Sequence, residues 1–188
     1  MTLYANRDRW TVTEARSVEQ FRGLQNDIKK LALGSYFAEL TEAVSDEDSP
    51  NPQLLPLCLN ALYALSEDIK EPEYIKPAFE MKLMAVSGFA PIVSHCSVCG
   101  VREMQRAYLN FSAGSLGCID CAAAGGTELS AGAIRALQYI IGCEHKKLFS
   151  FSLGDAALRE LGQAAEGYLL GQLERRFRTL EYYKSYIQ

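Results

Sequence analysis

The sequence has no long hydrophobic run. Its longest apolar stretch, from Leu83 to Val93, is interrupted by a serine, a glycine and a proline, and it falls short of the roughly 20 residues that cross a bilayer. The first ten residues already carry charged side chains and no apolar run follows them, so they do not form a secretory signal. We therefore expect no membrane segment and a cytoplasmic address.

Basic residues are fewer than acidic residues in this sequence. The chain has 19 Lys and Arg against 23 Asp and Glu, a net charge of -4, whereas a domain devoted to nucleic acid is usually strongly basic. Any binding of nucleic acid must therefore use a local patch. The 48% hydrophobic and 22% charged residues match average globular usage and exclude disordered and fibrous proteins. The 188 residues suit one packed domain, or one domain with an appendage.

The motifs of the common enzyme classes are missing. The sequence contains no Gly-rich dinucleotide loop, Walker loop, G-x-S-x-G elbow or H-E-x-x-H, each of which positions a cofactor or a catalytic group. A zinc deaminase needs an H-x-E motif and a proline directly before a C-x-x-C pair, but Ile92, Val93 and Gly117 stand in those places. We therefore expect no catalysis.

Helical periodicity covers most of the chain, and we expect a mainly α fold. Apolar residues at three- and four-residue steps predict helices over 17–44, 53–69, 76–87, 130–141 and from 155 to the C-terminus. The first of these begins with Ser17 followed by Gln20, a capping box, and is expected to break near Gly34. An acidic, proline-containing segment, 45–52, connects it to the second.

The first residues have a β pattern instead. β-prone side chains flank Asn6-Arg7-Asp8, which predicts a β-hairpin over 3–15. Two strands alone are marginally stable in water, so the hairpin must pack on the rest of the chain, on another chain, or on a missing part of its own sheet. We expect residues 1–16 to form this residual β unit and 17–188 the helical domain.

The strongest chemical signal is a pair of C-x-x-C motifs. Cys96 and Cys99 are separated by eighteen residues from Cys118 and Cys121, a spacing typical of a four-cysteine zinc site. Four thiolates complete a tetrahedral shell, so one zinc ion per chain would be structural and would hold a small ribbon inserted at about 91–126. The alternatives are a knuckle that has lost its metal and a thiol redox pair.

The remaining cysteines and the histidine next to the first knuckle are not expected to bind the metal. Cys58 and Cys143 lie in apolar segments and are expected to be inert core cysteines. His95 precedes the first knuckle and could replace a thiol as ligand, but with four well-spaced cysteines we expect it to be only a neighbour. Disulfides are not expected, because cytosolic reductants keep thiols reduced.

Two basic clusters are candidate binding surfaces. Arg7, Arg9 and Trp10 combine positive charge with an aromatic ring, which suits phosphate contact and base stacking; the alternative is a solvent-facing hairpin with a core Trp. The second cluster adjoins an apolar stripe from Leu169 to Leu180 and consists of Arg175, Arg176 and Arg178 with Lys184. Cations near a helix C-terminus also simply complement the helix dipole.

The order of these parts resembles the RecO family of bacterial DNA repair and recombination mediators. The resemblance covers nearly the whole chain and is most specific from Phe79 to Cys121, where the helix Ala78–Val86, a Gly-Phe-Ala-Pro turn, Cys-x-x-Cys-Gly, Phe-Ser-Ala-Gly and the second Cys-x-x-Cys follow one another. It implies an N-terminal OB-fold, a helical domain and a zinc ribbon. In this chain only the last strands of the OB-fold are expected.

The resemblance also implies a function. Members bind single- and double-stranded DNA, anneal complementary strands, associate with RecR, and engage the acidic C-terminal tail of single-stranded DNA-binding protein so that RecA can load. By this interpretation the protein is nucleoid-associated, and DNA contact would be electrostatic, through Arg7, Arg9 and Trp10, with Arg102 and Arg106 beside the knuckles. The alternative is an adaptor that binds RecR or the tail without holding DNA.

The tail would need an apolar groove with a basic rim. The stripe from Leu169 to Leu180, bordered by Arg175, Arg176 and Arg178, supplies such neighbours. The alternative is that packing against the helices around Leu31 and Leu83 uses up this stripe, in which case the groove lies elsewhere.

Overall fold

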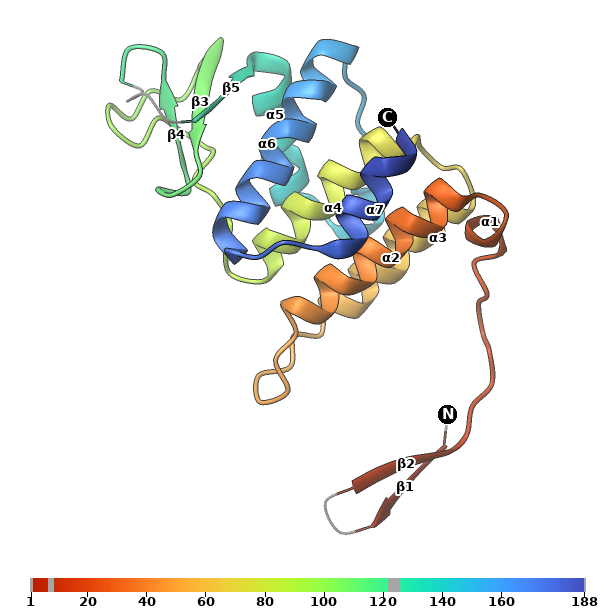
Figure 1. The fold of residues 1–188 in the computed structure, drawn as a ribbon. Helices are drawn as coiled ribbons and strands as arrows, with labels where there is room; N and C mark the ends of the chain where they lie inside the picture. The colour runs from red at the N-terminus through yellow and green to blue at the C-terminus, as the bar shows by residue number, and fades with distance from the viewer. Residues whose placement is uncertain (1, 7–8, 122–125, 188) are drawn as a thin grey trace.

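The computed structural model describes residues 2–6, 9–121 and 126–187. Its elements along the chain are β1 (Thr2–Asn6), β2 (Arg9–Glu14), α1 (Arg22–Gln25), α2 (Ile28–Ala43), α3 (Leu54–Ser66), α4 (Pro72–Val86), β3 (Arg106–Asn110), β4 (Ser115–Cys118), β5 (Thr127–Ser130), α5 (Ala131–Gly142), a 3-10 turn (His145–Lys147), α6 (Asp155–Leu173) and α7 (Arg178–Ile187). The expected mainly α fold with a small ribbon and an N-terminal hairpin is confirmed (Figure 1).

Helix α4 is the centre of the helical body. Helices α2 and α3 pack on one side of it and α5 and α6 on the other (Figure 1), and every residue from Pro77 to Met84 is buried. A helix that is enclosed on all sides is apolar around most of its circumference. In the described part of the chain, no helix is long and apolar enough to cross a membrane.

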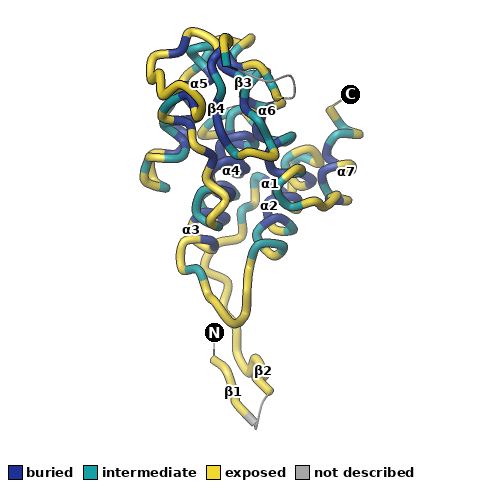
Figure 2. Tube along the Cα trace, turned by 90° about the vertical axis from the view of Figure 1, so that its left-hand side faces the viewer, coloured by how far each residue is buried: buried dark blue, intermediate teal, exposed yellow. Residues whose placement is uncertain are grey.

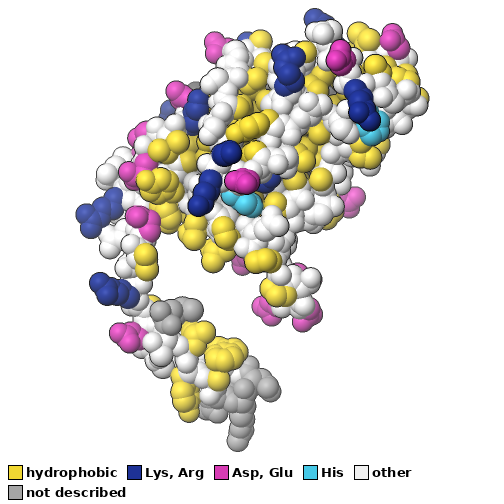
Figure 3. All heavy atoms as spheres, turned by 180° about the vertical axis from the view of Figure 1, so that it is seen from behind, with side chains coloured by type: hydrophobic (Ala, Val, Ile, Leu, Met, Phe, Trp, Pro, Cys, Tyr) yellow, Lys and Arg dark blue, Asp and Glu magenta, His cyan; other side chains and the backbone are white. Residues whose placement is uncertain are grey.

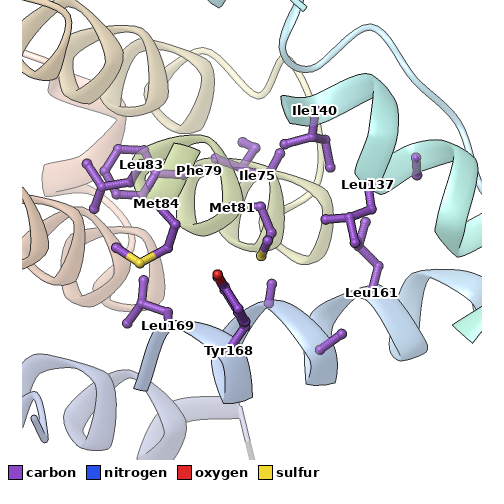
Figure 4. Packing of buried hydrophobic residues seen from close by; sticks show 14 of the residues in the cluster. Ile75, Phe79, Met81, Leu83, Met84, Leu137, Ile140, Leu161, Tyr168 and Leu169 are labelled. Atoms are coloured by element: carbon purple, nitrogen blue, oxygen red, sulfur yellow. The ribbon is translucent and has the colours of Figure 1, made fainter. Parts of the chain in front are cut away.

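The core extends outward from α4 in two directions. Phe79 packs on Phe37 of α2 with ring centroids 4.3 Å apart. Toward the opposite side, Met81 lies among residues of α5 and α6, including Leu137 and Leu161 (Figure 4). Because both sides belong to one continuous cluster, the helices and the ribbon share one core.

Two predictions about the first helix are wrong. Ser17 lies outside any helix, because Phe21 adopts a left-handed conformation (φ 43°) and α1 begins only at Arg22, without a side-chain cap. The helical break falls at Asp27, whose carboxylate accepts hydrogen bonds from the backbone N–H groups of Lys29 (2.8 Å) and Lys30 (3.3 Å) and starts α2. Gly34 stands inside α2, where α3 approaches closely.

Other helix boundaries also differ from the expected ones. Helix α4 begins at Pro72 rather than near Lys76, because proline at the first helical position loses no hydrogen bond. The expected apolar stripe from Leu169 to Leu180 spans two helices, since Glu174 is left-handed (φ 47°) and ends α6.

The hairpin stands apart from the helical body. It is joined to α1 by an extended segment (Figure 1), and its described side chains are exposed (Figure 2). The strands pair antiparallel, Leu3 opposite Val12 and Ala5 opposite Trp10, so these four side chains share one face. Hydrophobic side chains are visible on the hairpin from behind the molecule (Figure 3).

The ribbon is held against α6 by close contacts. Strand β3 lies between β4 and β5, antiparallel to both. The Tyr168 hydroxyl donates to the carbonyl of Phe89 (2.9 Å), and the Gln172 amide donates to that of Phe111 (2.5 Å). Gly167 lets the Phe111 ring lie on the helix, because a Cβ there would be 2.6 Å from a ring carbon.

This contact predicts unequal effects of two glycine substitutions in α6. Gly167→Ala should destabilise the protein by about 1–3 kcal/mol, because Phe111 must move away. Gly162→Ala, where a Cβ meets nothing within 4 Å, should be neutral or stabilise the helix by up to ~1 kcal/mol. Urea unfolding of both variants measures the difference, and equal stabilities would contradict the tight contact.

Candidate metal centre

Two tight turns bring the C-x-x-C pairs together. In the first, the Gly100 N–H donates to the carbonyl of Cys96 (2.9 Å) and the Cys96 N–H donates to that of Val101 (2.8 Å); Gly100 has φ +76°, which glycine adopts without strain. In the second, the Cys121 N–H donates to the carbonyl of Cys118 (3.0 Å). Each turn directs its two thiols toward the other pair.

The four sulfurs have the separation that a zinc ion requires. The Sγ atoms of Cys96, Cys99, Cys118 and Cys121 all lie within 4.8 Å of one another. Cys99 Sγ and Cys118 Sγ are 3.7 Å apart, and a tetrahedron with Zn–S bonds of about 2.3 Å has edges of about 3.8 Å. The cluster therefore fits a tetrahedral metal ion with soft ligands.

The thiols of this cluster have strongly different proton affinities. The backbone hydrogen bonds of Cys99 and Cys118 lower the pKa of Cys96 to about 6. Hydrogen bonds with Cys118 and Cys99, together with burial and charge, raise the pKa of Cys121 to about 12. Four thiolates this close repel one another unless a cation lies between them, so a bound divalent ion would stabilise all four as thiolates.

The other candidate ligands lie outside this cluster. His95 Nδ1 shares a 2.9 Å hydrogen bond with Ser94 Oγ, and the cluster of potential ligands consists of the four cysteines. Cys58 is buried in α3, and burial raises its pKa. The half-buried Cys143 lies 3.5 Å from the carbonyl of Ile140, and burial raises its pKa too. Both thiols are therefore poor nucleophiles.

The structure separates the predicted nucleic-acid residues. Arg7 lies outside the described residues. Arg9 and Trp10 are adjacent in β2, so their side chains point to opposite faces of the hairpin. The hairpin and the ribbon lie at opposite ends of the molecule (Figure 1). In the ribbon, Arg102 is exposed and Arg106 forms a 2.8 Å ion pair with Glu128. Among the described members of the two sets, no common surface joins the hairpin residues to the ribbon residues.

Of the predicted tail-binding arginines, two lie in the turn before α7 and the third begins that helix. Arg175, Arg176 and Arg178 are exposed. The apolar stripe beside them is buried: Leu169, Phe177 and Leu180 are at most 1% exposed. The alternative interpretation, that packing uses up this stripe, is therefore the one the structure supports, and these arginines have no apolar groove formed by the stripe.

A groove that the sequence did not reveal lies between α4, α6 and α7. Its volume is about 470 Å³. Pro77, Leu158, Tyr183 and Ile187 give it apolar walls. Its charged lining residues are Glu73, Lys76, Asp155, Arg159, Glu166 and Lys184. The groove brings α4 together with the consecutive helices α6 and α7, which are distant from it in sequence, so no local motif predicts it.

An ion network connects the wall of this groove, at Lys76, Glu166 and Lys184, to the buried core. Lys76 Nζ lies 2.8 Å from Glu80 Oε1 and 2.8 Å from Glu166 Oε2, and Lys184 also pairs with Glu166. The Tyr36 hydroxyl donates to Glu80 (2.8 Å). Burial raises the pKa of Glu80 although Lys76 opposes the shift. Burial also acts to raise the pKa of Glu166, but the two lysines lower it below its usual value.

Comparison with known proteins assigns most of the chain to one group. A family model described as "Recombination protein O C terminal" matches residues 25–181. The chain is similar to DNA repair protein RecO of Acetivibrio thermocellus, with 32% identity over 97% of this chain and 74% of the relative. It is similar to the RecO proteins of Symbiobacterium thermophilum, with 28% identity over 96% and 73%, and of Caldicellulosiruptor bescii, with 25% identity over 95% and 72%.

The thiol cluster predicts one zinc ion per chain. Cys99→Ser should release the metal and loosen the ribbon, because metal binding supplies folding free energy to so small a unit, while the helices keep their own core. Elemental analysis of freshly purified, reduced protein measures zinc, and circular dichroism measures the helices. The matched control, Cys143→Ser, should keep the metal; wild-type protein without zinc would contradict the prediction.

Proposed function

The chain belongs to the RecO family of DNA repair proteins, and from that premise we propose that it is a mediator of homologous recombination. In this role it binds and anneals DNA, associates with RecR, and helps RecA to load where single-stranded DNA-binding protein covers the strand. The observation that carries the proposal is the family match over residues 25–181. The role is one of binding without catalysis and belongs in the cytoplasm, at the nucleoid.

The proposed zinc ion has a structural role in this function. Four cysteine ligands leave no open position for water or substrate, so zinc bound by Cys96, Cys99, Cys118 and Cys121 would stabilise the ribbon. A stable ribbon keeps Arg102 and Arg106, which lie between the two knuckles in sequence, on a defined surface. The thiol redox alternative is less suitable, because the metal would occupy all four sulfurs.

An adaptor without DNA affinity of its own is the second candidate. It is favoured by the net charge of -4 and by the scattered distribution of Lys and Arg on the face seen in Figure 3. Affinity for DNA depends on the number of phosphates that a protein neutralises. The adaptor would bind RecR or the tail of single-stranded DNA-binding protein and leave DNA to its partners.

The groove between α4, α6 and α7 is our candidate for the tail site. An acidic peptide that ends in apolar residues needs an apolar pocket for its end and cations at the rim for its carboxylates. Leu158 and Ile187 supply apolar surface, and Arg159 is exposed beside them. No ion pair among the described residues involves Arg159, so its charge remains available to a peptide carboxylate.

DNA binding should be electrostatic and indifferent to sequence. We expect affinity for a single-stranded oligonucleotide to fall steeply with salt, and Arg102→Ala to reduce the slope of log K against log salt by about 0.7. Fluorescence anisotropy at several salt concentrations measures this. The exposed Arg135 of α5 gives a matched control, Arg135→Ala. Affinity that does not change with salt would contradict the mechanism, and no binding at all would favour the adaptor.

The tail should bind the groove saturably at low salt. For a fluorescent acidic peptide with an aromatic residue at its end, Arg159→Ala should weaken binding about threefold to tenfold, because one charge contact is lost. Removing the aromatic residue from the peptide should abolish binding. Arg135→Ala again serves as the control. Equal affinities of the two variants would remove the groove as the site, and no saturable binding would remove the tail as a partner.

A further inference from the structure

The outer face of α7 carries an aromatic pair of which Tyr182 is exposed and Tyr186 is half-buried against the core. Tyr182 and Tyr186 lie one helical turn apart, with ring centroids 4.9 Å apart, an interplanar angle of 85° and hydroxyls 2.6 Å apart. Tyr182 is 50% exposed. The opposite side of the helix contributes Leu180 and Tyr183 to the core. The Tyr182 ring is therefore in contact with solvent, and the half-buried Tyr186 supports it from the core side.

Positive charge adjoins this pair. Arg178 precedes Tyr182 by four residues, so the two side chains are neighbours on the helix surface, and Arg175 and Arg176 lie in the turn just before. None of the ion pairs among the described residues uses these three arginines. Arg175 lies 5.4 Å from the centre of the buried Phe177 ring.

The neighbouring acids limit how much electrostatics can contribute. Glu174 and Glu181 accompany the three arginines, which leaves one net positive charge on residues 174–182. So small a charge binds duplex DNA weakly. Tyrosine rings can stack only on bases that are not already paired and stacked within a duplex. The combination therefore favours single strands over duplex.

We propose that Arg178, Tyr182 and Tyr186 form a stacking platform for single-stranded DNA. The strand runs along the outer face of α7, with a base on the tyrosine pair and phosphates beside the arginines. This inference rests on the DNA-binding function proposed above and assigns part of it to a surface distinct from the hairpin and the ribbon. It also assigns the arginines to nucleic acid rather than to an acidic peptide.

The test compares two tyrosines of equal exposure. Tyr182→Ala should weaken binding of a fluorescent oligothymidine to the full chain by about tenfold, since stacking contributes strongly for each base, whereas Tyr182→Phe keeps the ring and should stay within about twofold. Tyr63 of α3 is also 50% exposed, and Tyr63→Ala is the matched control. Binding of duplex DNA should be the same for all four proteins.

Photocrosslinking tests the same contact without a substitution. An oligonucleotide with 5-iodouracil should crosslink to Tyr182, within the tryptic peptide Thr179–Lys184, and not to Tyr183, which is 3% exposed. Oligothymidine binding by wild-type protein that is unchanged in Tyr182→Ala would overturn the platform and leave the proposed function standing. No binding by wild-type protein would overturn both. Loss of acidic-peptide binding but not of DNA binding in Arg178→Ala would assign the arginines to the peptide instead.

Discussion

The enclosure of α4 is the constraint on which the rest of the structure depends. Its residues from Pro77 to Met84 are all buried, although two of them, Glu80 and Lys82, are charged. Burying a charge without a partner is very costly, so each needs a partner inside the protein. Lys82 donates to the carbonyls of Ile141 (2.9 Å) and Cys143 (2.5 Å) at the end of α5, and Glu80 pairs with Lys76 and Tyr36.

These polar contacts determine where the neighbouring helices can lie. Lys82 fixes the end of α5, and the Lys76–Glu166–Lys184 chain joins α4, α6 and α7. A buried pair of this kind is weak evidence for stability, but losing one partner is strongly destabilising. Lys76, Glu166 and Lys184 also line the groove. The shape of the groove is therefore coupled to the integrity of the core.

The parts that could be predicted from the sequence are those with local causes. The four-cysteine spacing predicted the cluster because each C-x-x-C turn is formed by consecutive residues, and the distance between the pairs matches one small ribbon. The hairpin and most helices followed from periodicity. The capping box at Ser17 failed because the left-handed Phe21 separates it from α1. In the sequence Glu80 resembles an ordinary surface charge, since only the packing of other helices around α4 buries it. The groove likewise depends on how distant helices pack.

The extended segment between the hairpin and α1 has a consequence for handling the protein. Residues 15–20 are all exposed, and among the described residues no hydrogen bond joins residues 15–18 to the helical body. Proteases cleave exposed, extended backbone most readily. Trypsin acting after Arg16 would detach β1 and β2 while every helix kept its backbone hydrogen bonds, so degradation of this protein would begin with loss of the hairpin and leave the helices and the ribbon as a resistant fragment.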